Sequence, residues 1–310
     1  MNGMRTLSFP TLGLGPRPSR TAGSPPREAG RPSMLTDQQV DHYQTFGFLV
    51  LPGYLGERET TNLGKELDHA LRDGYGAHFG DRAASGGIFG HWLPMMSGQR
   101  TPVSLALAED ARFLEAASQL LGARAVPTYA QGHLLSGEAG FHTDCGTGSQ
   151  GVKFAAYLEP LTSASGALQL MPGSHHAEFG AALAAWETRN PAMDAEHLRR
   201  KITGLPCQPA ETRPGDVIAF NWHTWHASIG GRDRHQWTIS YAQDPRTIDQ
   251  AKRLRQFFQS VVPDGDEPYD HAAYPCYDQH WLAADPADHT RANLTKRMRE
   301  LGLFEIAHGR

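Results

Sequence analysis

The segment GVKFAAYLEPLTSASGALQLMPGSH, residues 151–175, contains two short apolar runs separated by a turn of small residues. Lys153, Ala155 and Tyr157 occupy alternate positions, so they would share one face of an extended chain. Gly, Pro and Ser residues, which favour turns, bound both runs. The segment therefore predicts two short β-strands rather than a helix.

Comparable runs lie on both sides of this segment: VPTYAQGHLLS before it, and GDVIAFNW and HQWTISYA after it. Short strands at regular spacing, separated by turn residues, indicate a β-sandwich or barrel. One helical insertion, residues 179–202, interrupts them. We therefore predict a β core over about residues 127–245, surrounded by helices and followed by a helical extension over residues 246–310.

The residues before this core predict helices and one strand. Thr36 is suited to cap a helix that runs to about Thr45, and the following GFLVLP indicates a buried strand. Leucines at positions 63, 67 and 71 have helical spacing. Residues 75–100 look irregular and hold an exposed-looking cluster, IFGHWLPMM. Residues 1–33 are rich in Pro, Gly, Ser and Arg and predict a disordered tail, so residues 34–310 are expected to form one domain.

Charge and composition narrow the class of protein. The net charge of −4 gives no electrostatic reason to expect binding to nucleic acid or to an anionic membrane. No apolar run approaches the roughly 20 residues that span a bilayer. Cys145, Cys207 and Cys276 show no metal-ligand spacing and predict free thiols in a reducing cytoplasm. We expect a cytoplasmic protein whose partner is a small molecule, and its oligomeric state is not readable from the sequence.

The stretch GFHTDCGTGS, residues 140–149, places His142 and Asp144 two residues apart after a strand-like run. Chance alone would give about two His-x-acid triplets in a chain of this composition, and His176-Ala-Glu178 is the other one. On a strand, residues i and i+2 face the same side, so both side chains would point at one metal ion. Two histidines and one carboxylate form the open facial triad of iron(II) oxygenases, so a second histidine is required.

That histidine is sought in RPGDVIAFNWHTWHASIGGRDRHQWTISY, residues 213–241. His223 and His226 are both candidates, but they are three residues apart and would not face the same way on a strand. Arg234, on or next to the following strand, would need an anionic partner if it is buried. A carboxylate gripped by both arms of the guanidinium would suit it. A separate metal site at His175, His176 and Glu178 is disfavoured because PGSHH is a loop-and-turn stretch.

Four blocks, in this order, resemble the phytanoyl-CoA dioxygenase family of Fe(II)/2-oxoglutarate oxygenases. They are LTDQQVDHYQTFGFLVLPGYL, FHTD, KFAAYLEPLTSASGALQLMPGSH, and PGDVIAFNWHTWHAS followed by Arg234, and they cover most of residues 35–245. The resemblance implies a mainly β fold with flanking helices around a double-stranded β-helix (jelly-roll, cupin-like) core. It implies iron on His142, Asp144 and His226, with Arg234 and Ser228 binding the far carboxylate of 2-oxoglutarate. The gap between His226 and Arg234 is shorter than in many family members, which leaves Arg232 as an alternative.

Other polar and aromatic residues are candidates to line the site. Gln131 and Lys153 are expected to bind the inner end of 2-oxoglutarate. Residues suggested to contact the substrate are His91, Trp92, Met96, His133, Tyr157 and Trp222. Ordinary packing is the alternative for each of them, above all for the aromatic and methionine cluster around residue 92.

The resemblance also implies a reaction. We expect the hydroxylation, or another oxidation, of an unactivated C–H bond in a specialised-metabolite intermediate, with O2 consumed and succinate and CO2 released. Halogenases of this kind carry a small residue where Asp144 stands, so chlorination is not expected. The alternative is a non-catalytic metal-binding jelly roll that acts as a sensor or ligand-binding module. A zinc hydrolase would need a general base near the metal, and the sequence offers no obvious one.

Overall fold

The computed structural model describes residues 35–80, 84–85, 88–146, 148–263, 267–283 and 289–308. The predicted tail, residues 1–33, lies outside the described residues. Among the helices of the described part, none is both long enough and apolar enough to cross a bilayer.

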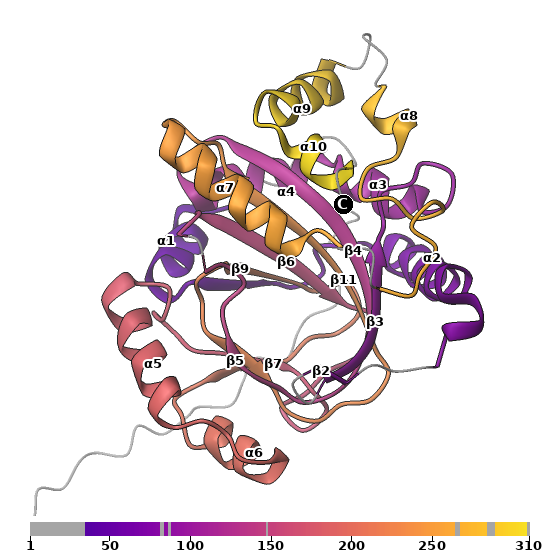
Figure 1. Cartoon of the computed structure of the whole chain (residues 1–310). Helices are drawn as coiled ribbons and strands as arrows, with labels where there is room; N and C mark the ends of the chain where they lie inside the picture. The colour runs from indigo at the N-terminus through magenta and orange to yellow at the C-terminus, as the bar shows by residue number, and fades with distance from the viewer. Residues whose placement is uncertain are drawn as a thin grey trace, which may run out of the picture. The chain divides into compact units, whose positions relative to one another are not determined.

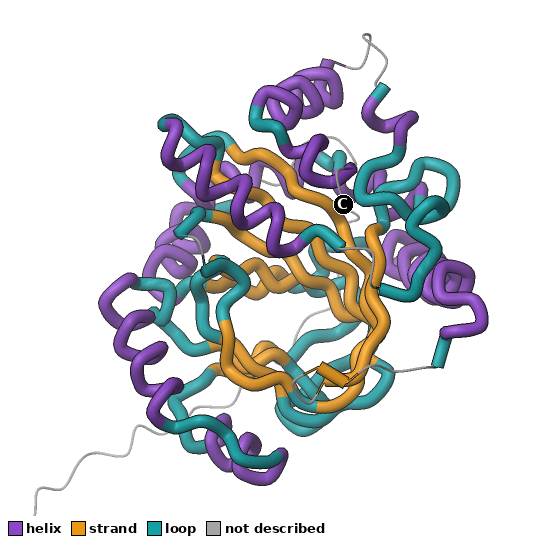
Figure 2. Tube along the Cα trace, viewed as in Figure 1, coloured by secondary structure: helices purple, strands orange, loops and turns teal. Residues whose placement is uncertain are grey.

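Two antiparallel β-sheets form the core, and their strands curve around a common interior (Figure 1, Figure 2). The larger sheet has the order β1-β9-β6-β11-β4-β3-β2 and the smaller the order β5-β10-β7-β8. The larger sheet consists of β1 (Phe48–Leu51), β2 (Ala84–Ser85), β3 (Ile88–Pro94), β4 (Ala125–Gly137), β6 (Gly151–Tyr157), β9 (Val217–Asn221) and β11 (Arg234–Gln243). The smaller consists of β5 (Ala139–His142), β7 (Leu168–Leu170), β8 (Gln208–Ala210) and β10 (His226–Ser228). The predicted jelly-roll fold is confirmed, although the sheet begins well before residue 127.

The inward faces of the two sheets pack against each other. One hydrophobic cluster joins Tyr157 and Ile218 of the larger sheet to Leu168 and Leu170 of the smaller. Paired residues on neighbouring strands face the same side of a sheet. The strand register places four residues next to one another in a row that crosses the strands on this inward face: Trp92, His133, Gln236 and Tyr157.

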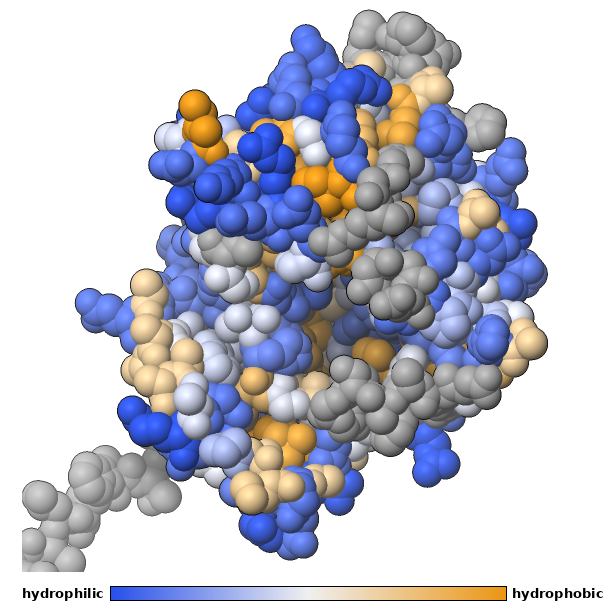
Figure 3. All heavy atoms as spheres, viewed as in Figure 1, coloured by the Kyte–Doolittle hydropathy of each residue, from blue (hydrophilic) through white to orange (hydrophobic). Residues whose placement is uncertain are grey.

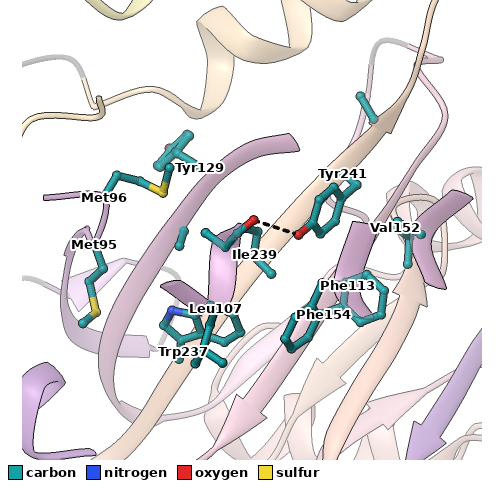
Figure 4. Close-up of a cluster of buried hydrophobic side chains, with 14 of the residues drawn as sticks. Met95, Met96, Leu107, Phe113, Tyr129, Val152, Phe154, Trp237, Ile239 and Tyr241 are labelled. Carbon is teal, nitrogen blue, oxygen red and sulfur yellow. Dashed lines mark hydrogen bonds between the residues drawn. The ribbon is translucent and has the colours of Figure 1, made fainter. Parts of the chain in front are cut away.

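Helices cover the outward face of the larger sheet: α2 (Glu57–Tyr75), α3 (Pro102–Ala108) and α4 (Ala111–Leu121). Trp237 and Tyr241 alternate on the outward face of β11 and pack near Phe113 of α4, as Figure 4 shows. The Tyr241 hydroxyl donates a hydrogen bond of 3.2 Å to the carbonyl of Ala108. Burial of these aromatic rings holds α3 and α4 on the sheet.

Strand β3 corrects the expectation that residues 75–100 are irregular and expose their aromatic and methionine side chains. The strand pairs with β4 over Ile88–Pro94, a pairing that the many glycines of this region did not suggest. His91 and Met95 face outward under the helices, where they are 2% and 0% exposed. Met96 joins the same buried cluster (Figure 4). Only alternate residues of β3, Trp92 among them, face the interior.

The remaining helices enclose the rest of the core. The first, α1 (Asp37–Phe46), is capped by Thr36 as predicted. The helical insertion forms α5 (Ala177–Arg189) and α6 (Ala195–Thr203), and Leu198 of α6 packs on Phe141 of the smaller sheet. A short 3-10 helix, η1, spans Gly76–His78. The C-terminal extension forms α7 (Ile248–Val261), α8 (Gln279–Leu282), α9 (His289–Glu300) and α10 (Leu303–His308).

A substitution of Phe113 tests the packing of α4 on the sheet. Its ring is fully buried and lies edge-on to Phe154 and Trp237, with ring centroids 5.3 and 5.6 Å away. Phe113→Ala is expected to lower the free energy of unfolding by about 3–5 kcal/mol, measured by urea denaturation. Phe179→Ala, at a side chain that is 40% exposed, should change it by less than about 0.5 kcal/mol. Equal effects of the two substitutions would contradict this packing.

Candidate metal centre

The structure brings together the three residues expected to bind a metal ion. Strands β5 and β10 pair with His142 directly opposite His226, and the two ring centroids are 4.2 Å apart. Asp144 follows β5 and places Oδ1 3.8 Å from Nε2 of His226. One ligand atom from each of the three lies within 4.8 Å of the other two. Across the described residues, no other set of three His, Cys, Asp or Glu side chains converges in this way.

Backbone carbonyls orient both imidazole rings. Nδ1 of His142 donates to the carbonyl of Gly140, and Nδ1 of His226 donates to that of Thr224, each at 2.8 Å. Because a carbonyl only accepts, these bonds place the proton on Nδ1 and leave the Nε2 lone pair for a metal. Burial, together with the nearby His142, lowers the pKa of His226 to about 3. That ring is therefore neutral at pH 7.

A β-bulge lies beside this pair of histidines. His226 pairs with His142, but Ser228 pairs with Ala139, so β5 has one residue more than β10 over this stretch. Bulges turn side chains away from the regular alternation of a strand and are common beside active sites. Here the bulge lies between His226 and Ser228, the two residues of β10 that face the interior.

Asp144 is held from two directions. Its backbone N–H donates to the carbonyl of Trp222, 2.9 Å away, which ties the loop after β5 to the end of β9. The ammonium of Lys153 lies 2.9 Å from Oδ2. Burial alone would raise the pKa of Asp144, but Lys153, His226 and His142 outweigh it and lower the pKa to about 2. The carboxylate is therefore ionised, with Oδ2 held by Lys153 and Oδ1 facing His226.

The other histidines considered as ligands point elsewhere. Nε2 of His223 donates to the carbonyl of Ser149, 2.8 Å away. Nε2 of His175 bonds to the carbonyl of Gln44, and this ring with its neighbours His176 and Glu178 does not belong to the converging group. The geometry thus selects His226 over His223 as the partner of His142 and Asp144.

Arg234, the first residue of β11, is a buried cation that is 2% exposed. Its two terminal nitrogens donate to the carbonyls of Gly166 and Gly137, at 2.8 and 3.0 Å, and its Nε has no hydrogen-bond partner. Among the described residues, no carboxylate lies within ion-pair distance of it. Burial lowers the pKa of its guanidinium, which shows how poorly the charge is solvated. A charge in this setting calls for an anionic ligand. Arg232, by contrast, is exposed.

Two glycines allow the backbone to enclose this guanidinium. A Cβ atom at Gly166 would lie 2.8 Å from Cδ of Arg234, and one at Gly231 would lie 2.7 Å from the same atom. Both glycines have positive φ angles, +98° and +83°, which other residues rarely adopt. The position of Arg234 is therefore fixed by close backbone contact as well as by hydrogen bonds.

Ser228 lies between the histidine pair and this arginine. It is two residues beyond His226 on β10, a distance of about 6.8 Å along a strand, and is 3% exposed. Its strand partners are Ala139 and Leu168. The carbonyls that accept hydrogen bonds from Arg234 belong to Gly137, two residues before Ala139, and to Gly166, two residues before Leu168. The triad, Ser228 and Arg234 thus follow one another along the interior.

The other predicted site residues divide into two groups. Gln131, His133, Lys153, Tyr157 and Trp92 share the inward face of the larger sheet. Burial, and then the charge of Lys153, lower the pKa of His133 to about 3.

The second group takes part in hydrophobic packing. His91 and Met96 are buried in the packing outside the interior, and the Trp222 ring stacks on Phe257 of α7 at 4.1 Å. Gln236 and Thr238 also face inward but were not expected at the site. The alternation of residues from Arg234 along β11 would have identified them.

The family model described as phytanoyl-CoA dioxygenase (PhyH) matches residues 43–235. Among proteins of curated function, no sequence matches.

Solved structures similar to this chain include HygX from Streptomyces hygroscopicus, crystallised with nickel and 2-oxoglutarate. It is 20% identical, with 70% of this chain and 94% of HygX covered and a TM-score of 0.53. Another is SnoK, a non-heme alpha ketoglutarate dependent carbocyclase from nogalamycin biosynthesis, at 18% identity, 69% and 88% coverage and a TM-score of 0.51. At these identities the likeness is one of fold.

Proposed function

The chain belongs to the phytanoyl-CoA dioxygenase family, and on this premise we propose that it is an iron(II)- and 2-oxoglutarate-dependent oxygenase. Its reaction converts 2-oxoglutarate, O2 and a C–H bond of a small molecule into succinate, CO2 and the oxidised product. The observation that carries the proposal is the buried guanidinium of Arg234, which forms no ion pair with any carboxylate of the described residues. It lies farther along the interior than Ser228, as seen from the His-Asp-His triad.

His142, Asp144 and His226 would hold the iron. Two neutral imidazoles and one carboxylate on one side of an ion suit iron(II) and leave its other positions open. When bound, iron supplies the redox chemistry that couples decarboxylation of 2-oxoglutarate to oxidation of the C–H bond. Lys153 pairs with Oδ2 of Asp144, which would leave Oδ1 for the iron.

Arg234 and Ser228 would bind the far carboxylate of 2-oxoglutarate. The guanidinium has one nitrogen without a partner, and Ser228 offers a hydroxyl on the path from the triad. This clamp orients the co-substrate along the interior with its keto end toward the metal ligands. Gln131 and Lys153 remain our candidates for its inner end, and Trp92, His133 and Tyr157 for contacts with the substrate.

We infer hydroxylation rather than halogenation because Asp144 completes the triad and is held by Lys153. SnoK and the epimerase SnoN are both described as enzymes of nogalamycin biosynthesis, which supports a specialised-metabolite intermediate as the substrate. The free thiols of Cys207 and Cys276 support a cytoplasmic location. A metal-binding sensor without oxygenase activity would have no use for a buried carboxylate clamp.

An anaerobic titration tests this proposal. Purified protein mixed with Fe(II) and 2-oxoglutarate is expected to show a weak visible charge-transfer band, because the keto acid would bind the iron directly. Succinate, which lacks the keto oxygen, is the control and should give no band. Bound iron without a band would favour the metal-binding module, and the absence of iron binding would refute both functions.

A further inference from the structure

Glu267, in the segment that follows α7, carries a carboxylate bonded to a neutral donor. Its Oε1 accepts a hydrogen bond of 3.1 Å from the indole Nε1 of Trp92. Among the described residues, no lysine or arginine forms an ion pair with it. Glu267 and Trp92 are both partly exposed, so a ligand can reach them. An indole N–H is a neutral donor and leaves the negative charge uncompensated.

Aromatic rings surround this carboxylate. The centroid of Tyr269 lies 6.5 Å from that of Trp92 and 6.1 Å from that of Tyr75. Burial raises the pKa of Tyr75 to about 12, and the charge of Glu267 adds to the rise. Burial likewise raises the pKa of Tyr269, with a smaller contribution from Glu267. A carboxylate at the edge of a Trp ring, whose face is a site for cations, is a suitable setting for an organic ammonium ion.

The segment that carries Glu267 is anchored to the helix α2. The Asp270 backbone N–H donates to the carbonyl of Gly74, 2.8 Å away. Oδ1 of Asp270 accepts from the backbone N–H groups of Ala272 and Ala273, each at 3.0 Å. Nε2 of His271 donates to the backbone carbonyl of Glu267 at 2.8 Å. The carboxylate is therefore held in place before any ligand arrives, which lowers the entropic cost of binding.

Trp92 connects this group to the interior where the metal ligands lie. It pairs with His133 on the inward face, and burial, together with the charge of nearby Lys153, lowers the pKa of His133. Strands β6, β11, β4 and β3 are consecutive neighbours about 4.8 Å apart, and Trp92 lies in the row of Tyr157, four residues along β6 from Lys153. Trp92 and Lys153 are therefore about 20 Å apart along the surface of the curved sheet. Figure 3 shows that this face of the molecule is hollowed next to α7, the helix that precedes Glu267.

We propose that Glu267 and Trp92, with the buried Tyr269 packed behind them, form a recognition site for an ammonium group of the substrate. The inference rests on the proposed function and names its substrate class: a small molecule with an amine or quaternary ammonium remote from the carbon that is oxidised, within about 20 Å of it. Glu267 supplies the opposite charge, and the indole of Trp92 supplies a face for the cation. The separation between the two groups then determines which carbon reaches the metal ligands.

Choline and its neutral isostere 3,3-dimethyl-1-butanol are the probes. Each is titrated calorimetrically into the full-length protein loaded anaerobically with Fe(II) and 2-oxoglutarate. Choline is expected to bind at least tenfold more tightly than the isostere. Glu267→Gln should weaken choline binding to the level of the isostere, whose own affinity should not change. Equal binding of the two probes to the wild-type protein, no binding of choline, or full choline affinity in Glu267→Gln would each overturn the proposal.

Two further variants sharpen this test. Glu178→Gln removes an exposed carboxylate on α5 and should leave choline binding unchanged, which controls for overall charge. Trp92→Leu should weaken choline binding, and Trp92→Phe should restore part of it because an aromatic face returns. Melting temperatures near that of the wild type establish that each variant is folded. If the proposed function is wrong, the charge-transfer band with Fe(II) and 2-oxoglutarate will be missing. Choline can then be titrated into the iron-free protein, so that the ammonium site is tested independently of the oxygenase activity.

Discussion

The variant His226→Ala is expected to bind Fe(II) at least about 100-fold more weakly than the wild-type protein and to show no charge-transfer band with 2-oxoglutarate. Loss of a residue that only orients a metal ligand typically costs 10–100-fold in affinity, so loss of the ligand itself should cost more. His226 is buried, neutral and held by the carbonyl of Thr224, with Nε2 directed toward Asp144. Calorimetric titration with Co(II) or Fe(II) measures the change directly.

His223→Ala is the matched control for this experiment. The two histidines are three residues apart, but the ring of His223 bonds to the carbonyl of Ser149 rather than facing the triad. Its replacement should leave the metal affinity within about threefold of the wild type. If His223→Ala lost the metal and His226→Ala kept it, the assignment of the distal ligand would be wrong.

Arg234→Met is expected to raise the 2-oxoglutarate concentration at half-maximal band intensity by about 30-fold or more. Removing one member of a buried, hydrogen-bonded charge pair costs 2–5 kcal/mol, and about 1.4 kcal/mol corresponds to a tenfold change in affinity. Methionine preserves much of the length and apolar volume of the arginine stem. The affinity for Fe(II) alone should change little, because Arg234 lies beyond Ser228 from the metal ligands.

Arg232→Met is the control for this second prediction. Arg232 lies two residues away and is exposed, so its loss removes the same charge without affecting the interior. The concentration of 2-oxoglutarate needed for the band should stay within about twofold of the wild type. A band that Arg234→Met leaves unchanged at low 2-oxoglutarate would show that another group binds the far carboxylate.

Local signals in the sequence predicted many of the elements. Thr36 marked the start of α1, and the leucines at 63, 67 and 71 identified α2, because helical spacing and capping are properties of a few adjacent residues. The alternation of Lys153, Ala155 and Tyr157 identified both β6 and its inward face. His142 and Asp144 were predicted as metal ligands for a similar reason, since they are two residues apart in sequence, and the structure places them close together.

Other features depended on contacts between distant segments. Strand β3 was missed because it is defined by pairing with β4, some 40 residues later, and not by its own glycine-rich composition. Met96 looked exposed because nothing in its neighbourhood indicates the helices that cover it. Residue spacing alone left His226 and His223, and Arg234 and Arg232, as alternatives, and the family resemblance favoured His226 and Arg234. The side that each of these residues faces depends on the register of β10 and β11. Glu267 gave no local signal, because its meeting with Trp92 joins residues 175 positions apart.

The two glycines that enclose Arg234 also limit how this protein can vary. Gly166 and Gly231 lie in loops that connect strands, and loops in most proteins accept insertions and substitutions readily. Here any side chain at either position would meet the arginine within 3 Å and would also require an unfavourable backbone angle. Substitutions at these two positions should therefore be tolerated only as far as the buried guanidinium of Arg234 allows, although the positions lie in loops. A library that diversifies loops should leave both glycines unchanged.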